Sequence, residues 1–257
     1  MSVNSLRMIS KATIKWIRSL ENKKGRETTG QFLAEGHKVV SDLLPLLECQ
    51  LLVATNAWLQ TYKPRIKGEI IETDQATLDR ISLLKNPQQV LAVFKQPSSL
   101  VSPEDVQGQL CLALDTIQDP GNLGTILRIA DWFGIHHLIC SPDTVDAYNP
   151  KVVQATMGAI GRVNVVYTPL ETFLPATGLP LFGTFLEGTP IHQADLPSAG
   201  IVVLGNEGNG ISKPIADLVQ GKLYIPDYPA GQTGSESLNV AVATAIVCHE
   251  FRRRLQG

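Results

Sequence analysis

Hydrophobic residues after position 109 form short continuous runs, and segments with a helical spacing of apolar residues lie between them. Strands are predicted at 110–116, 136–140, 163–168, 181–186, 201–205 and 222–226. Helices are predicted near 123–133, 149–160 and 211–220, with a long helix from about 237 to 255. Continuous apolar strands joined by helices are typical of a parallel sheet buried on both faces. The pattern therefore predicts an α/β domain with a mostly parallel sheet.

The first 96 residues alternate in the same way over shorter segments. Helices are predicted at about 5–21, 37–47, near Trp58 and from Asp74, and strands at FLAEG, 50–55, 69–71 and 89–95. The stretch KQPSSLVSPEDVQGQ (95–109) is rich in Pro, Ser and acidic residues, which is typical of a linker. We expect a small α/β domain at 1–96, a linker at 97–108 and a second domain at 109–257.

Composition places the chain among globular proteins, with 44% hydrophobic and 18% charged residues over 257 positions. No apolar run reaches the roughly 18 residues that span a bilayer, and the N-terminus lacks the apolar core of a secretory signal. The four cysteines are far apart without a CxxC pair, so we expect reduced thiols and a cytoplasmic protein. The histidines lack metal-ligand spacing, and no metal site is predicted.

The net charge of −2 conceals a difference between the two halves. Residues 1–96 hold 14 Lys and Arg against 9 Asp and Glu, whereas the rest of the chain holds 8 against 15. A basic front half suggests a polyanionic partner, although a solvated helix face explains the same excess.

The first polar stretch that follows a predicted strand is DPGNLGTILRIA (119–130). Pro120 starts the turn, and Asn122 is predicted to cap the helix. Arg128 lies off the apolar stripe of this helix and on the same side as Gly124, four residues earlier. The arrangement fits either a ligand-binding arginine or a plain turn with a surface arginine.

The second stretch, GNEGNGIS (205–212), has three glycines between a buried strand and a helix. Glycine lets backbone groups approach a ligand closely. The order is GxxGxG, so neither the dinucleotide fingerprint nor a phosphate-binding P-loop is present. Glu207 would repel a bare phosphate and is suited to pair with a cation such as Arg128 or to accept from a hydroxyl. A plain strand-to-helix turn is the alternative.

The third stretch is the Pro- and Gly-rich segment 226–239, which leads into the last helix. Ser235 or Ser237 is predicted to cap this helix, and Asn239 is expected to make a polar contact. The apolar stripe of the helix is predicted to contain Leu238, Ala241, Val242, Ala245 and Ile246. Arginines 252–254 lie where cations stabilise a helix C-terminus, so we assign them a structural role.

Three motifs in order, NLGTILR, LGNEGNGIS and IP…SESLNVAVA, resemble those of the SpoU (TrmH-like) RNA 2′-O-ribose methyltransferases of the SPOUT class. The resemblance covers residues 110–257. The first half resembles the family's substrate-binding domain, an α/β fold similar to ribosomal protein L30e, in KKGRETTGQFLAEGHKVV and NPQQVLAVFK.

The resemblance implies a C-terminal domain with a deep trefoil knot that works as a homodimer, with the active site and Trp132 near the subunit interface. It implies S-adenosyl-L-methionine as cofactor and no metal. The residues implied to bind the cofactor are Thr184, Leu204, Gly205, Asn206, Gly210, Ile225, Pro226 and Leu238. Those implied for catalysis are Arg128, Asn122, Glu207, Ser237 and Asn239.

The implied reaction is methylation of a ribose 2′-hydroxyl, and the separate N-terminal domain favours ribosomal RNA as the substrate. A tRNA methyltransferase and a non-catalytic RNA-binding protein on the same scaffold are the alternatives. An NAD-dependent oxidoreductase would need GxGxxG after the first strand of the sheet, where this chain has DPGNLG. Because a guanidinium stays protonated in proteins, we assign Arg128 to charge stabilisation and leave the proton acceptor unassigned.

Overall fold

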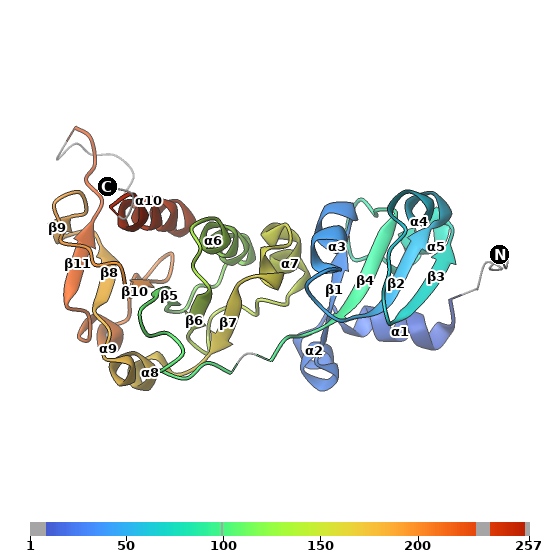
Figure 1. Cartoon of the computed structure of the whole chain (residues 1–257), viewed down its shortest axis with the longest axis horizontal. Coiled ribbons are helices and arrows are strands. Elements are labelled where there is room, and N and C mark those ends of the chain that lie inside the picture. Colours follow the sequence, from blue (N-terminus) through green and yellow to red (C-terminus); the bar gives the residue numbers. More distant parts are fainter. Residues whose placement is uncertain (1–8, 99, 230–236, 255–257) are drawn as a thin grey trace. The chain divides into compact units, whose positions relative to one another are not determined.

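The computed structural model describes residues 9–98, 100–229 and 237–254, and it divides into two units (Figure 1). The first unit comprises Met1–Ser98 and Asp146–Gly161, and the second comprises Ser99–Val145 and Arg162–Gly257. Residues 146–161, which the predicted division assigns to the C-terminal domain, therefore pack with the N-terminal part of the chain. The predicted domain boundaries themselves stay a prediction.

The first unit is built on a mixed four-stranded sheet in the order β1-β4-β2-β3. The strands are β1 (Gln31–Glu35), β2 (Cys49–Thr55), β3 (Glu69–Thr73) and β4 (Val90–Lys95). Strand β4 runs antiparallel to β1 and β2, whereas β2 and β3 are parallel. The helices between them are α1 (Lys11–Ser19), α2 (Lys23–Thr29), α3 (His37–Leu43), α4 (Asn56–Tyr62) and α5 (Gln75–Ile81).

Helix α2 is an element that the hydrophobic pattern did not predict. Its sequence, KKGRETT, has no apolar residue that could mark a buried face, and it contains a glycine. A Cβ on Gly25 would lie 2.0 Å from the carbonyl oxygen of Ser19, so the close approach of α2 to the end of α1 requires glycine. The helix predicted at 5–21 is α1, which begins at Lys11 after the Ser10 cap and ends at Ser19. Positions 5–8 of the prediction lie outside the described residues.

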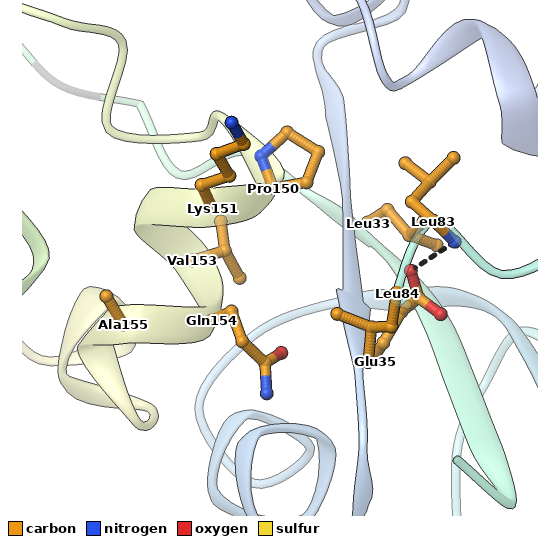
Figure 2. A pocket seen from close by; sticks show the side chains of 9 residues that line it. All are labelled: Leu33, Glu35, Leu83, Leu84, Pro150, Lys151, Val153, Gln154 and Ala155. Carbon is orange, nitrogen blue, oxygen red and sulfur yellow. Dashed lines mark hydrogen bonds between the residues drawn. The ribbon is translucent and has the colours of Figure 1, made fainter. Parts of the chain in front are cut away.

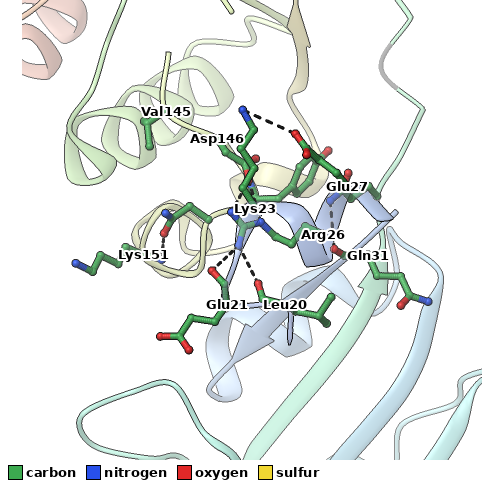
Figure 3. A network of polar contacts seen from close by, with 12 residues as sticks. Leu20, Glu21, Lys23, Arg26, Glu27, Gln31, Val145, Asp146 and Lys151 are labelled. Atoms are coloured by element: carbon green, nitrogen blue, oxygen red, sulfur yellow. Dashed lines mark hydrogen bonds and ion pairs between the residues drawn. The ribbon is translucent and has the colours of Figure 1, made fainter. Parts of the chain in front are cut away.

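A buried arginine fastens the segment 146–161 to the rest of the first unit (Figure 3). The Arg26 side chain donates to the backbone carbonyls of Leu20 (2.8 Å) and Glu21 (2.7 Å). It also donates from Nε (2.8 Å) and from a terminal nitrogen (2.6 Å) to one carboxylate oxygen of Asp146. Helix α7 (Pro150–Thr156) and a 3-10 turn, η1 (Ala159–Gly161), follow this anchor. The ring of Tyr148 packs on Phe32 of β1 with 4.9 Å between centroids.

The second unit contains a seven-stranded sheet in the order β7-β6-β5-β10-β8-β11-β9. The strands are β5 (Leu110–Leu114), β6 (His137–Cys140), β7 (Asn164–Tyr167), β8 (Leu181–Phe185), β9 (Thr189–Pro190), β10 (Gly200–Leu204) and β11 (Gly221–Tyr224). Every neighbouring pair is parallel, which confirms the predicted parallel sheet. Because β5, β10, β8 and β11 are neighbours, their carboxyl ends share one edge.

Helices α6 (Pro120–Trp132) and α10 (Val240–Arg253) pack against each other, as do α8 (Leu170–Thr177) and α9 (Lys213–Ala216) (Figure 1). The sequence pattern missed α8, whose Pro175 is unusual inside a helix, and the two-residue strand β9. The helix predicted at 211–220 is only the short α9. Among the described residues, no helix has the length and apolarity needed to cross a membrane, and no cluster of His, Cys, Asp and Glu could hold a metal ion.

Helix α10 buries a face that includes Ala241 of the predicted stripe but otherwise differs from the predicted one. The stripe predicted for burial leaves Leu238 and Val242 each 50% exposed and Ile246 37% exposed. The buried residues of the helix are Val240, Ala241, Thr244, Val247, Cys248, Glu250 and Phe251. The prediction failed because α10 carries apolar residues on two faces, and the pattern alone does not say which face meets the sheet.

Candidate functional site

The three polar stretches follow three strands of the same parallel sheet, and Glu207 joins the second stretch to the first. Stretch 119–130 follows β5, stretch 205–212 follows β10, and stretch 226–239 follows β11. The Glu207 carboxylate accepts from the Asn122 side-chain amide at 2.9 Å. It also accepts from the backbone N–H groups of Asp119 (3.3 Å) and Gln118 (3.4 Å). The second loop is therefore held against the start of α6.

Asn239 connects the third stretch to the first. Its side-chain amide donates to the Asn122 side-chain oxygen at 2.9 Å. Its own side-chain oxygen accepts from the backbone N–H groups of Ala241 (3.0 Å) and Val242 (3.3 Å). One hydrogen-bonded chain, Glu207–Asn122–Asn239, thus brings the three stretches to one place.

Two of the predicted helix caps are wrong. Asp119, and not Asn122, caps α6, because its side chain accepts from the Asn122 backbone N–H at 2.8 Å. With Pro120 in the first helical position, the cap falls on the residue before the proline. Asn239 caps α10 in place of the predicted serines; Ser237 is exposed, and Ser235 lies outside the described residues. The Asn122 side chain is consequently available to bridge the other two loops.

The loop after β10 folds back on itself around Asn206. The Asn206 side-chain oxygen accepts from the N–H groups of Gly208 (2.9 Å) and Asn209 (3.0 Å), and its amide donates to the Thr116 carbonyl at 2.8 Å. The backbones of Asn206 and Gly210 exchange two hydrogen bonds of 2.9 Å. A Cβ on Gly205 would lie 2.2 Å from the Gly210 backbone, so only glycine fits at the base of the loop.

Asp115 is a residue of the site that the sequence reading missed. It is 5% exposed, and its carboxylate accepts from the backbone N–H of Ser212 at 2.7 Å. The contact ties the end of the second loop to the end of β5. The signal in the sequence is an aspartate directly after the apolar run LCLAL, at a position that the predicted strand 110–116 includes.

Arg128 lies on the exposed side of α6. Within the described part of the chain it has no hydrogen bond or ion pair. The predicted pairing of Glu207 with Arg128 is wrong, because the Glu207 oxygens accept from Asn122 and from the backbone. The guanidinium therefore keeps its donors available for an anion from outside the chain.

The other predicted site residues lie at the ends of β8, β10 and β11 or in the loops that follow. Thr184 is opposite Leu223 in the β8–β11 register. Leu204 is buried as the last residue of β10, and Gly205 and Gly210 belong to its loop. Ile225 and Pro226 directly follow β11, and Leu238 precedes α10 with half of its surface exposed. The edge thus offers apolar side chains and a glycine loop beside a carboxylate and two amides.

Comparison with known proteins identifies both parts of the chain. Residues 109–249 match the model of the SpoU rRNA Methylase family, and residues 11–92 match the MRM3-like substrate binding domain. The 23S rRNA (guanosine(2553)-2′-O)-methyltransferase RlmP of Bacillus subtilis is 31% identical over 91% of this chain and 94% of its own length. The 23S rRNA (guanosine-2′-O-)-methyltransferase RlmB of Neisseria meningitidis is 31% identical over 70% of this chain and 75% of its own length.

Solved structures agree over almost the whole chain. A putative RNA methyltransferase of the TrmH family from Porphyromonas gingivalis has a TM-score of 0.86 and 41% identity, covering 96% of this chain and 100% of that one. An rRNA methyltransferase from Sinorhizobium meliloti, with AdoMet bound, has a TM-score of 0.82 and 31% identity, covering 96% of this chain and 97% of that one. These matches confirm the predicted fold class, and the chain belongs to the SpoU rRNA methylase family.

Proposed function

We propose that the protein transfers a methyl group from S-adenosylmethionine to a ribose 2′-hydroxyl of ribosomal RNA. The observation that carries the proposal is the chain Glu207–Asn122–Asn239, which gathers the three family motifs at the start of α6. The same helix carries Arg128, which has no hydrogen bond or ion pair to any residue that the structure describes. The names of the relatives support it, since RlmP and RlmB are 23S rRNA 2′-O-methyltransferases. The solved relatives with bound AdoMet support the cofactor.

The residues at the carboxyl edge fit this cofactor chemically. Ile225 and Leu238, which are both at least partly exposed, offer apolar surface for an adenosine, and the buried Leu204 and Gly205 hold the start of the glycine loop in place. We assign cofactor binding to these four residues and to Thr184, Asn206, Gly210 and Pro226. When bound, the cofactor supplies a methyl group on a positively charged sulfur, which a hydroxyl oxygen can attack in line.

Arg128 acts in this proposal as a fixed positive charge. A guanidinium remains protonated in proteins, so it can hold a phosphate of the substrate and stabilise negative charge that develops on the ribose oxygen. Asn122, Glu207 and Asn239 fix the loops around it, and Ser237 lies exposed two residues before Asn239. Alignment of the attacking oxygen with the methyl group is itself a large part of the rate enhancement of such sites.

The proposal includes a homodimer, a trefoil knot and a cytoplasmic location. The exposed apolar residues of α10, with Trp132 of α6 at 84% exposure, support a subunit interface on these helices. The insertion of β10 between β5 and β8 and the bond from Asn239 to Asn122 support a knotted C-terminal part. The four cysteines are free and buried, which supports a reducing compartment. We retain the division into 1–96, a linker at 97–108 and 109–257, with 146–161 packed on the first unit.

A methyl-transfer assay tests the function. The purified chain is incubated with isotope-labelled S-adenosylmethionine and either ribosomal RNA or total tRNA that lacks the modification. Nuclease digestion and mass spectrometry then map the labelled nucleotide. We expect one 2′-O-methylated nucleotide in ribosomal RNA. Label found only in tRNA would show that tRNA, and not ribosomal RNA, is the substrate. Label in neither RNA would contradict the proposal.

Arg128→Ala separates catalysis from cofactor binding. Loss of a charge that stabilises the developing alkoxide should lower kcat by roughly 10²- to 10³-fold. The Kd for S-adenosylmethionine, measured by calorimetry, should stay within about twofold, because Arg128 is not among the residues assigned to the cofactor. Arg128→Lys keeps the charge but not the planar guanidinium, so its kcat should lie between those of the unchanged protein and Arg128→Ala. An equal loss of kcat and cofactor affinity would instead place Arg128 in the cofactor site.

A further inference from the structure

A groove in the first unit lies between strand β1, the loop after α5, and α7 (Figure 2). A cavity of about 350 Å³ has Leu33, Leu83 and Val153 on its apolar walls, with Glu35, Lys151 and Gln154 beside them. A second, more open cavity of about 580 Å³ shares Glu35, Leu84 and Gln154 with the first and extends to His37, Lys38 and Lys85. The two cavities therefore form one continuous groove, and all of its residues belong to the first unit.

His37, which lines the second cavity, belongs to a stack of aromatic rings. The exposed His37 ring lies on the Tyr62 ring with 4.0 Å between centroids and 26° between planes. Tyr62 is 44% exposed, and its ring packs against the buried ring of Trp58, with 4.9 Å between centroids and 38° between planes. Ser41 lies within hydrogen-bond distance, 3.0 Å, of the near ring nitrogen of His37. The rings are thus held in place while part of their surface faces solvent.

The groove beside this stack is basic and rich in amides. Lys85 is exposed and forms no ion pair within the described part of the chain, and Lys151 is likewise exposed. Lys38 pairs with Asp42 at 2.7 Å on the surface of α3, a kind of pair that is weak in water. The Glu35 carboxylate already accepts from the Ser82 hydroxyl and from the Leu83 N–H, so it has a structural role.

We propose that this groove binds one unpaired nucleotide of the RNA substrate, with the base stacked on the His37–Tyr62 pair and a neighbouring phosphate near Lys85. Exposed aromatic rings offer a face on which any base can stack, and lysines contribute the electrostatic attraction to phosphate. The amides of Asn86, Gln88 and Gln154 line the same groove and can donate to or accept from a base edge. The proposal rests on the proposed function, since it names where that RNA contacts the first unit.

Two variants of Tyr62 test the stacking. Tyr62→Leu keeps an apolar side chain but removes the ring, and it should weaken binding of a fragment of the methylated ribosomal RNA by roughly 5- to 150-fold. Tyr62→Phe keeps the ring and should bind within about twofold of the unchanged protein. Binding is measured by fluorescence anisotropy on full-length protein. Thermal unfolding and S-adenosylmethionine affinity, which should not change, confirm that Tyr62→Leu is folded.

A pair of lysine variants tests the phosphate contact. Lys85→Gln should lower the slope of log Kd against log salt by about 0.7, as expected for one lost phosphate contact on a single strand. Lys95→Gln is the matched control, because Lys95 is exposed at the far end of β4, roughly 17 Å along the strand from Val90. It should leave the slope unchanged.

The outcomes distinguish this inference from the proposed function. If the unchanged protein methylates ribosomal RNA and Tyr62→Leu binds that RNA with full affinity, the groove proposal is wrong and the function stands. The groove proposal is also wrong if Lys85→Gln and Lys95→Gln change the salt slope equally. If the unchanged protein methylates no RNA, the proposed function itself fails.

Discussion

At the scale of single residues, Asn239 combines two roles that substitution can separate. Its oxygen caps α10, and its amide donates to Asn122. Asn239→Ser keeps a capping oxygen but loses the side-chain amide that reaches Asn122, so the free energy of unfolding should change little. Asn239→Ala loses both and should cost about 1 kcal/mol. Both variants should lower kcat for methyl transfer to a similar extent, which denaturant unfolding and steady-state kinetics can measure side by side.

A cap outside the site provides the control for Asn239. Asp74 caps α5 in the first unit by accepting from the Thr77 N–H at 2.8 Å. Asp74→Ala should therefore cost a similar free energy of unfolding, about 1 kcal/mol, with kcat unchanged. If Asn239→Ser methylated RNA at the full rate, the bond to Asn122 would have no part in assembling the site.

The caps also show what the sequence could predict at this scale. The three polar stretches were identified from glycine, proline and amide positions, and the structure brings them together. The pattern could not decide which of several polar residues caps each helix, because Asp119 and Asn122 both have suitable side chains. Arg128 was correctly placed off the buried face of α6, whereas its lack of a partner among the described residues depends on Glu207 being engaged elsewhere.

At the scale of elements, α10 has a second apolar face that is not covered within the described residues. Val242 and Ile246 are four residues apart on α10 and are both exposed, and Leu238, just before the helix, is exposed as well. If this face is the subunit interface of the proposed homodimer, Val242→Glu should place a charge in an apolar contact and convert the dimer to monomer. Light scattering coupled to size-exclusion chromatography gives the mass directly.

The dimer prediction has its own control. Leu100 is 91% exposed in the second unit, away from α10 in sequence, and Leu100→Glu makes the same chemical change. It should leave the mass unchanged. A monomeric unchanged protein, or a dimer that tolerates Val242→Glu, would contradict an interface on this face. Sequence periodicity alone identified the helix and these residues, but it could not distinguish a face that packs in the fold from one that is left for a partner.

The C-terminal end of α10 predicts a pH dependence. Hydrogen bonds from Arg253, and then from Arg254, hold the pKa of Glu250 at about 2. This is below the value of about 4.3 for an unfolded glutamate, so the carboxylate stabilises the fold above about pH 4 and loses that contribution as pH falls toward 2. Glu250→Gln should lower unfolding free energy at pH 7 by on the order of 1 kcal/mol, because solvent screens the half-exposed Arg253.

Urea unfolding at several pH values checks the Glu250 prediction. The difference between the unchanged protein and Glu250→Gln should be largest at neutral pH and shrink toward zero near pH 2. An equal difference at both ends would mean that the substitution acts through side-chain shape and not through charge.

At the scale of the whole molecule, the chain passes between the two units three times. The alternation of strands and helices predicted both sheets, yet it gave no sign that residues 146–161 would pack with the first unit. This segment continues an alternating pattern that suits either unit equally well. The placement of residues 146–161 depends on a long-range contact between Arg26 and Asp146. These residues are 120 positions apart, so no local sequence pattern connects them.

Arg26 is therefore expected to couple the unfolding of the two units. Segment 146–161 is joined at both ends to the second unit and is anchored to the first by the buried Arg26 side chain. Arg26→Ala leaves Asp146 and two carbonyls without their donor and should cost about 3 kcal/mol. Calorimetry of the unchanged protein should show one cooperative transition, whereas Arg26→Ala should separate it into two, with a van't Hoff enthalpy below the calorimetric one.

A neighbouring lysine makes this test specific. Lys23 is in the same helix, and its pair with Glu27 at 3.8 Å is exposed, so Lys23→Ala should change stability by less than about 0.5 kcal/mol and leave one transition. Asp146→Asn, which keeps the shape but removes the charge, should weaken the coupling less than Arg26→Ala does. If Arg26→Ala lowered the Tm of a single transition without dividing it, the segment would be held mainly by apolar packing such as that of Tyr148 on Phe32.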